Sequence, residues 1–162
     1  MTQLVGEVLR LQRAGWIVRR AEAVQTLSAQ VLRRYPWVPP EIQSLLCAYV
    51  RICRADEKAW LLCAPDFSGT SQSAYRWNEW ELQSLEGARC DPSWQQYIQT
   101  FWDKHFPIAL SIDDGYSYHA LRSDGAVVAG REPEYEEARQ VAESYAEFLG
   151  LNCLAWTSYT AR

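Results

Sequence analysis

Residues 106–130 of this 162-residue chain read FPIALSIDDGYSYHALRSDGAVVAG, and their pattern decides the fold. From Phe106 to Ile112, apolar side chains alternate with small or polar ones, which is typical of a strand with one buried face. Asp-Gly pairs at 114–115 and 124–125 follow, and they suit tight turns because glycine readily takes a positive φ. Short strands joined this closely form an antiparallel meander, since parallel strands need long crossovers. We expect its strands at 106–112, 116–122 and 126–130.

Helices are predicted on both sides of this meander. Before it, apolar residues recur at helical spacing, and prolines and Asp91 mark the starts of two helices. After it, four glutamates between 132 and 137 crowd the first turn of a predicted helix, where negative charge complements the helix dipole. Gly150 is expected to stop that helix. The predicted helices span about 1–12, 19–34, 41–54, 79–87, 91–102 and 133–149.

One further strand is expected at 59–63, where the sequence AWLLC is apolar throughout. Residues 65–76 contain proline, glycine and several hydroxyl side chains, so a loop is predicted there. Because helices and antiparallel strands occupy separate parts of the chain, the predicted fold class is α+β, with a central, mostly antiparallel sheet packed by helices. A chain of 162 residues is expected to form a single domain, 1–162.

Charge is unevenly distributed along the chain. The net charge is −4, but residues 1–60 carry +4, residues 61–99 carry −3 and residues 100–162 carry −5. This acidic C-terminal part argues against nucleic-acid binding, which needs a concentrated basic surface. It is compatible with a basic protein partner, and equally with a solvated acidic helix face.

The chain is expected to be a cytoplasmic protein that does not enter a membrane. No stretch approaches the roughly 20 apolar residues that span a bilayer. Residues 1–7, MTQLVGE, lack the basic and apolar regions of a secretion signal. The five cysteines are irregularly spaced and form no C-x-x-C pair, so we interpret them as reduced core residues and expect no zinc site.

Patterns that indicate catalysis are sparse. No serine that could join His105 or His119 lies in a G-x-S-x-G elbow, and no glycine-rich phosphate loop occurs. Asp113 and Asp114 fit turn chemistry better than a calcium loop, and the glutamates at 132–137 fit helix capping better than an acid–base pair. An enzyme would have to be built on these same groups. We therefore expect no catalytic activity, no metal and no cofactor.

The segment WNEWE at 77–81 is unusual for a junction between a loop and a helix. Its two indoles, Trp77 and Trp80, can close and shield the core. Alternatively, they can anchor a partner, because tryptophan is enriched at binding hot spots. Both interpretations are open.

The run from Phe106 to Tyr118 resembles the C-terminal core of the SUKH superfamily, which includes the yeast Smi/Knr cell-wall regulators. The turn at 124–125, the acidic run EPEYEE at 132–137 and the helix end EFL at 147–149 are similar to the motifs that close this family's domain. These motifs place the resemblance mainly in the C-terminal half of the chain.

A weaker similarity lies upstream. YPWVPPE at 35–41 is similar to the family's entry to a helix, whereas RADE at 54–57 stands where the family usually has a glycine-containing turn. The resemblance covers about residues 20–150. It implies an α+β domain whose central sheet is mostly antiparallel.

The resemblance also implies a role. Many bacterial members look like immunity proteins of polymorphic toxin systems, which bind and block a cognate toxin, and eukaryotic relatives act as regulators or scaffolds. We therefore expect a non-enzymatic protein-binding module, an immunity protein whose partner is a basic toxin domain. The alternative is a regulatory scaffold or small-molecule sensor of the same fold.

In this interpretation, carboxylates steer and pair with the basic partner while aromatic side chains anchor it. The residues expected to bind the partner are Trp77, Trp80, Asp113, Asp114, Tyr116, Tyr118 and Glu132.

Overall fold

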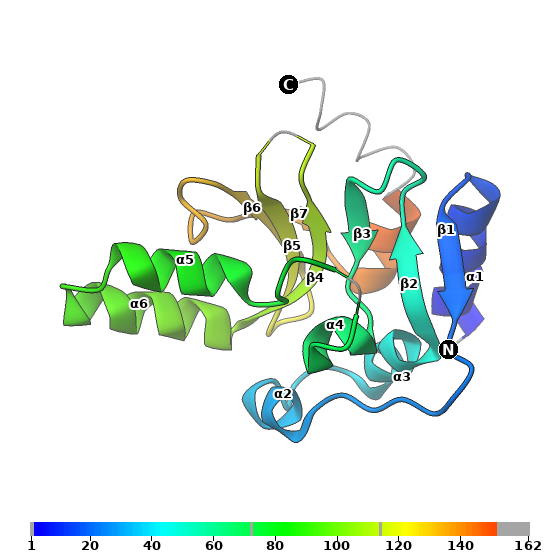
Figure 1. Ribbon diagram of the computed structural model, residues 1–162, viewed down its shortest axis with the longest axis horizontal. Coiled ribbons are helices and arrows are strands. Elements are labelled where there is room, and N and C mark those ends of the chain that lie inside the picture. The colour runs from blue at the N-terminus through cyan, green and yellow to red at the C-terminus, as the bar shows by residue number, and fades with distance from the viewer. Residues whose placement is uncertain (1, 72, 114, 152–162) are drawn as a thin grey trace.

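The computed structural model describes residues 2–71, 73–113 and 115–151, and these residues form an α+β fold around one sheet (Figure 1). The sheet has seven strands in the order β1-β2-β3-β4-β5-β6-β7, and each strand is antiparallel to its neighbours. The predicted fold class and the mostly antiparallel sheet are therefore confirmed. The strands are β1 (Ile17–Arg20), β2 (Tyr49–Cys53), β3 (Ala59–Leu61), β4 (His105–Ser111), β5 (Ser117–Arg122), β6 (Val127–Arg131) and β7 (Arg139–Ala142).

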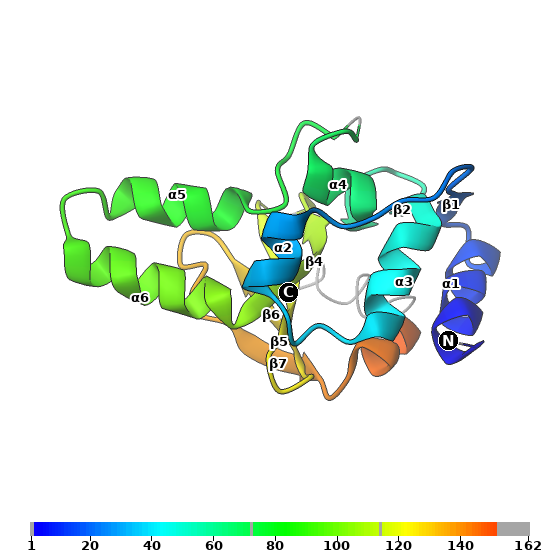
Figure 2. The same ribbon diagram turned by 90° about the horizontal axis from the view of Figure 1, so that it is seen from below.

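Helices surround this sheet on several sides. In Figures 1 and 2, α5 and α6 lie side by side and extend away from the sheet, whereas α1 lies at the opposite end, beside β1. Residues 145–151 are also helical. No helix in the described ranges is both long enough and apolar enough to cross a membrane. The other helices are α1 (Thr2–Arg13), α2 (Ala29–Arg34), α3 (Pro40–Ala48), α4 (Ala64–Ser68), α5 (Glu79–Gly87) and α6 (Pro92–Asp103).

The predicted meander is confirmed as β4, β5 and β6. Leu110 pairs with Tyr118, which in turn pairs with Gly130, so the three strands are in direct register. Gly115 and Gly125 take φ values of 77° and 95°, as the Asp-Gly turns require. Helices α5 and α6 and strand β3 are also confirmed at nearly the predicted positions.

The first of the longer predicted helices is wrong. Residues 19–34 contain the end of β1, an extended segment and only the short α2. The reason is that Arg19 and Arg20 continue β1 and pair with Arg51 and Tyr49 of β2, and this pairing across the sheet outweighs a weak helical period.

The helix predicted at 41–54 ends at Ala48, because the next five residues form β2. Tyr49, Val50 and Ile52 are aromatic or β-branched and fit a pleated sheet better than a helix. In contrast, the loop predicted at 65–76 begins with the short α4, whose start is fixed by Pro65 and by a hydrogen bond from the Cys63 amide to Asp66.

The last predicted helix is only partly correct. Its first half is a turn followed by β7, in which Gln140 and Ala142 pair with Val128 and Val127 of β6. Only 145–151 is helical, and Gly150 lies within this helix and does not stop it. The acidic run at 132–137 therefore lies in a turn that leads into an edge strand and caps no helix.

Aromatic side chains fill much of the core. Phe67 stacks on Phe106 with ring centroids 5.0 Å apart, and Tyr118 lies 4.9 Å from Trp102 and 5.3 Å from Trp80. These contacts join the middle of the meander to α4, α5 and α6. Much of the unusual aromatic content thus serves packing, where aromatic pairs add to the stability gained by burial alone.

Candidate functional site

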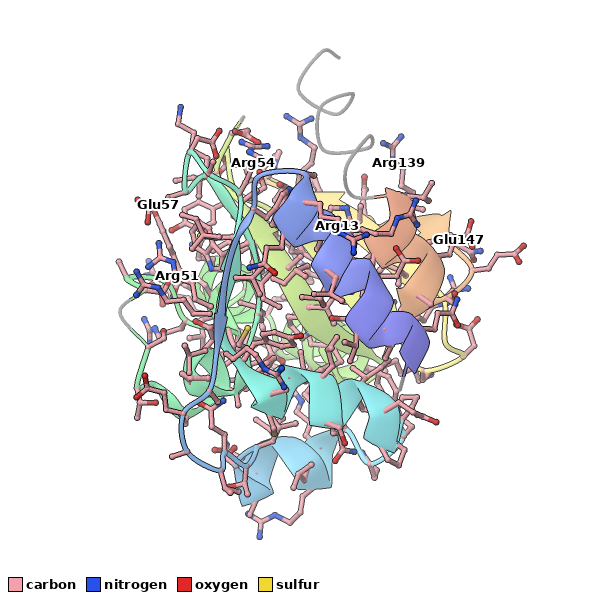
Figure 3. The ribbon with its side chains drawn as sticks, turned by 90° about the vertical axis from the view of Figure 1, so that its right-hand side faces the viewer. Arg13, Arg51, Arg54, Glu57, Arg139 and Glu147 are labelled. Atoms are coloured by element: carbon pink, nitrogen blue, oxygen red, sulfur yellow. The ribbon has the colours of Figure 1, made fainter. Side chains whose placement is uncertain are left out.

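A pocket of about 170 Å³ lies against β2 and β3. It is lined by side chains from both strands, by Asp66 of α4 and by the segment 71–75, of which Gln72 is outside the described residues. Arg51 and Glu57, which contribute its charged part, lie on the same side of the molecule in Figure 3. We call this feature the β2–β3 pocket.

Asp66 is the most enclosed charged group of the pocket. Its carboxylate accepts a hydrogen bond of 2.8 Å from the Cys63 amide, which caps α4. Burial raises the pKa of Asp66, and the hydrogen bonds from Cys63 and the Ser71 side chain, together with the charge of Arg51, offset only part of this rise. Among the described residues, Asp66 forms no ion pair.

The cation of the pocket already has a partner. Arg51 forms an ion pair with Glu57, and its Nε donates to the Cys53 sulfur at 3.2 Å. With one arginine and two carboxylates, the pocket carries a net charge of −1 when Asp66 is ionised. The unbalanced charge is therefore negative, and it belongs to Asp66.

Aromatic rings connect the pocket to the neighbouring surface. Tyr75 lies 5.7 Å from Trp60, which also lines the pocket, and 5.1 Å from Tyr116 in an edge-to-face arrangement. Burial, together with Tyr75 and the nearby Glu79, raises the pKa of Tyr116, so its hydroxyl stays protonated. Glu132 accepts a 3.1 Å hydrogen bond from the Tyr116 amide. We call Tyr75, Tyr116, Glu79 and Glu132 the tyrosine–glutamate surface.

The structure brings together only some of the residues expected to bind a partner. Tyr116 and Glu132 are in contact and belong to the tyrosine–glutamate surface. Trp77 is half-buried and packs on Tyr35 and Phe67 of the core. Asp114 lies outside the described residues.

Trp80 and Tyr118 need correction, because both side chains are 0% exposed and a partner cannot touch them. Trp80 stacks on Trp102, with the ring planes 17° apart. The Tyr118 hydroxyl donates to the carbonyl oxygen of Tyr135. Both are core residues. Trp80 therefore closes the core and does not anchor a partner.

Asp113 serves a structural role in this geometry. Its carboxylate pairs with Arg54, which also pairs with Asp56 at 2.8 Å. This arrangement fastens the end of β4 to the turn between β2 and β3. Because most of the Asp113 side chain is covered, it is poorly placed to bind another molecule.

Three residues of the pocket were not predicted from the sequence: Asp66, Tyr75 and Arg51. For Asp66 a signal existed, since a proline followed by an acid is typical of a first helical turn. Arg51 was assigned to a helix, although YVRIC also fits a strand. Nothing in the composition of 71–75 indicates that Tyr75 joins the pocket to Tyr116.

Burial lowers the pKa of both histidines. Burial, with a smaller effect from Arg139, lowers the pKa of His119 to about 3, so its ring is neutral. Burial also lowers the pKa of His105, whose ring stacks on Phe101 at 3.9 Å. Within the described part of the chain, no three histidine, cysteine or acidic residues lie close enough together to hold a metal ion.

A second exposed aromatic group lies on α6, away from the pocket. Trp94 and Tyr97 are 49% and 58% exposed and lie one helical turn apart. The projecting α5–α6 pair in Figure 1 carries them at the far end of the molecule from β1. Because they lie outside the tyrosine–glutamate surface, a variant at Tyr97 can serve as a control for a variant at Tyr116.

The chain was compared with protein families, curated proteins and solved structures, and no family model, curated protein or solved structure matched it.

Proposed function

We propose that this chain is a non-enzymatic protein-binding module that binds a basic partner, in the manner of an immunity protein that neutralises a cognate toxin. The observation that supports this proposal is the tyrosine–glutamate surface, where Tyr75 and Tyr116 pack edge to face beside Glu79 and Glu132. The resemblance of about residues 20–150 to the SUKH superfamily supports the immunity role. The length of the chain supports a single domain, and the lack of a signal-like start supports a cytoplasmic location.

The chemistry of this surface suits a basic protein. Tyrosine offers a large contact area with few rotatable bonds, so little conformational entropy is lost when a partner covers it. Carboxylates at the edge attract a basic partner and disfavour acidic ones. The hydrogen bond from the Tyr116 amide to the Glu132 carboxylate holds the two kinds of group next to each other before binding, which reduces the cost of ordering them.

The alternative function, a small-molecule sensor, is favoured by the β2–β3 pocket. However, its volume of about 170 Å³ is well below the roughly 300 Å³ at which ligand sites for drug-sized molecules begin. A sensor using this pocket would be limited to a very small ligand. The size of the pocket therefore favours the protein-binding proposal.

The test is a pull-down from cells of the source organism with tagged wild-type protein and two variants. Tyr116→Ala combined with Glu132→Gln removes one aromatic and one charged group from the surface. Tyr97→Ala is the matched control, because it removes an exposed tyrosine from α6. We expect one basic protein to be retained by the wild type and by Tyr97→Ala, and to be lost with the double variant.

A second readout tests the immunity role. The retained protein, expressed alone in a bacterial host, should arrest growth, and co-expression of the wild-type chain should restore it. If the double variant retains the partner as well as Tyr97→Ala does, the tyrosine–glutamate surface is not the interface. If the retained protein is harmless, the scaffold role replaces the immunity role.

A further inference from the structure

We propose that the β2–β3 pocket receives a lysine or arginine side chain of the protein partner, held between Asp66 and the rings of Trp60 and Tyr75. This inference rests on the proposed function, because the pocket adjoins the tyrosine–glutamate surface through Tyr75. It adds the identity of the group that the partner presents.

Charge is the first argument. Asp66 is a partly buried carboxylate that forms no ion pair among the described residues. The charge of Arg51 lowers its pKa, but burial outweighs this effect, and Arg51 is already paired with Glu57. A partly buried carboxylate without an ion-pair partner is unfavourable, and a cation entering the pocket reduces that penalty. An anionic ligand would meet two carboxylates and would have to displace Glu57 from Arg51.

The walls of the pocket are the second argument. Trp60 and Tyr75 lie 5.7 Å apart, and both line the pocket. Aromatic faces attract ammonium and guanidinium groups, most strongly when water is excluded. They also cover the aliphatic stem of a lysine or arginine side chain. Two serine hydroxyls, from Ser71 and Ser73, complete the polar part of the lining.

Size and position are the third argument. A pocket of about 170 Å³ is too small for most ligands but suits one inserted side chain. Its aromatic wall continues to the half-buried Tyr116 and the exposed Glu132 beside it. Because Tyr75 both lines the pocket and contacts Tyr116, a partner that covers Tyr116 lies close enough to place one of its own side chains in the pocket.

The direct test uses N-acetyl-arginine amide as the probe and N-acetyl-citrulline amide as its uncharged equivalent. Binding is followed by NMR of isotope-labelled protein, through the Trp60 indole and the amides of 73–75. We expect only the arginine probe to bind, and to bind more weakly as the pH falls through the raised pKa of Asp66. Asp66→Asn should raise the dissociation constant of the arginine probe by about tenfold or more.

Two further variants keep this result interpretable. Ala74→Trp adds bulk at an exposed position that lines the pocket; it blocks entry while leaving Asp66 and the α4 cap unchanged. Asp124→Asn, on the distant turn between β5 and β6, is the charge control. Ala74→Trp should abolish binding of the probe, and Asp124→Asn should leave it unchanged.

The two proposals fail in different ways. If arginine and citrulline probes bind equally, or if Ala74→Trp leaves arginine binding unchanged, the pocket inference is overturned. Retention of the basic partner through Tyr116 would then still support the proposed function. If the arginine probe binds as expected but no basic partner is retained, the pocket chemistry is supported and the proposed function falls.

Discussion

Tyr118 shows how closely an aromatic ring can pack against a glycine on the neighbouring strand. Tyr118 of β5 is paired with Gly130 of β6, and its hydroxyl donates to the Tyr135 carbonyl. A Cβ atom at position 130 would lie 2.5 Å from the Tyr118 hydroxyl oxygen and 2.6 Å from two ring carbons. Because the ring is fully buried and hydrogen-bonded, it cannot move aside without disturbing the core.

Gly130→Ala is therefore expected to lower the free energy of unfolding by about 1–3 kcal/mol, the usual cost of overpacking a core. Urea denaturation measures this loss. Gly6→Ala is the matched control, since no atom lies within 4 Å of a Cβ there and the position is inside α1. The control should be stabilised by about 0.5–1 kcal/mol. Equal stability of Gly130→Ala and wild type would contradict the proposed packing.

Individual binding residues were only partly predictable. Tyr116 and Glu132 were predicted from the family resemblance and from the acidic and aromatic character of the C-terminal half, and the structure places them in contact; their role in binding stays a prediction. Trp80 and Tyr118 were misplaced for a physical reason. An indole or phenol is apolar enough for a core and polar enough for a surface, so only the packing of Trp80 on Trp102 decides between them.

At the scale of elements, one ion-pair cluster connects three helices. Arg34 at the end of α2 donates two hydrogen bonds, of 2.7 and 2.6 Å, to the two oxygens of Glu81 in α5. Its Nε donates to Asp103 at the end of α6 at 2.9 Å. Glu81 is only 5% exposed, and both of its carboxylate oxygens accept from Arg34. The cluster attaches the projecting α5–α6 pair to the body of the molecule.

Arg34→Met should therefore destabilise the protein by about 2 kcal/mol or more, because it leaves the Glu81 carboxylate buried without a cation. Part of this cost is reduced by the partial exposure of Arg34 to solvent. The double variant Arg34→Met, Glu81→Leu should recover most of the loss, since no buried charge remains. Thermal unfolding of the two single variants and the double variant measures the coupling. Simple additivity of the two single losses would rule out this coupling.

Elements defined by local sequence were predicted, whereas elements that depend on distant partners were not. The meander needs only alternation and two Asp-Gly turns, all contained within residues 106–130. In contrast, β1 forms because Ile17 pairs with Cys53, and β7 forms because Gln140 pairs with Val128. Such pairings override local helical patterns, and no single stretch of sequence reveals them.

At the scale of the whole molecule, the proposed function assigns the acidic C-terminal part and the pocket to different stages of binding a partner. Residues 100–162 carry a net charge of −5, which attracts a basic protein over distances comparable to the Debye length. Tyr75, Tyr116 and the β2–β3 pocket act only after contact. Long-range charge is expected to control the association rate, and the desolvated contacts are expected to control dissociation.

This division predicts two separable kinetic effects, measured by surface plasmon resonance with the retained partner. Raising the salt concentration from 0.05 to 0.5 M (roughly a threefold shorter Debye length) should slow association by about tenfold or more, with a much smaller effect on dissociation. Tyr116→Ala should instead speed dissociation and leave association nearly unchanged. Glu134 and Glu137 are exposed and follow Glu132 in the sequence. Neutralising both should slow association, as added salt does. If salt acted mainly on dissociation, the partner would be held by exposed ion pairs and not by the tyrosines and the pocket.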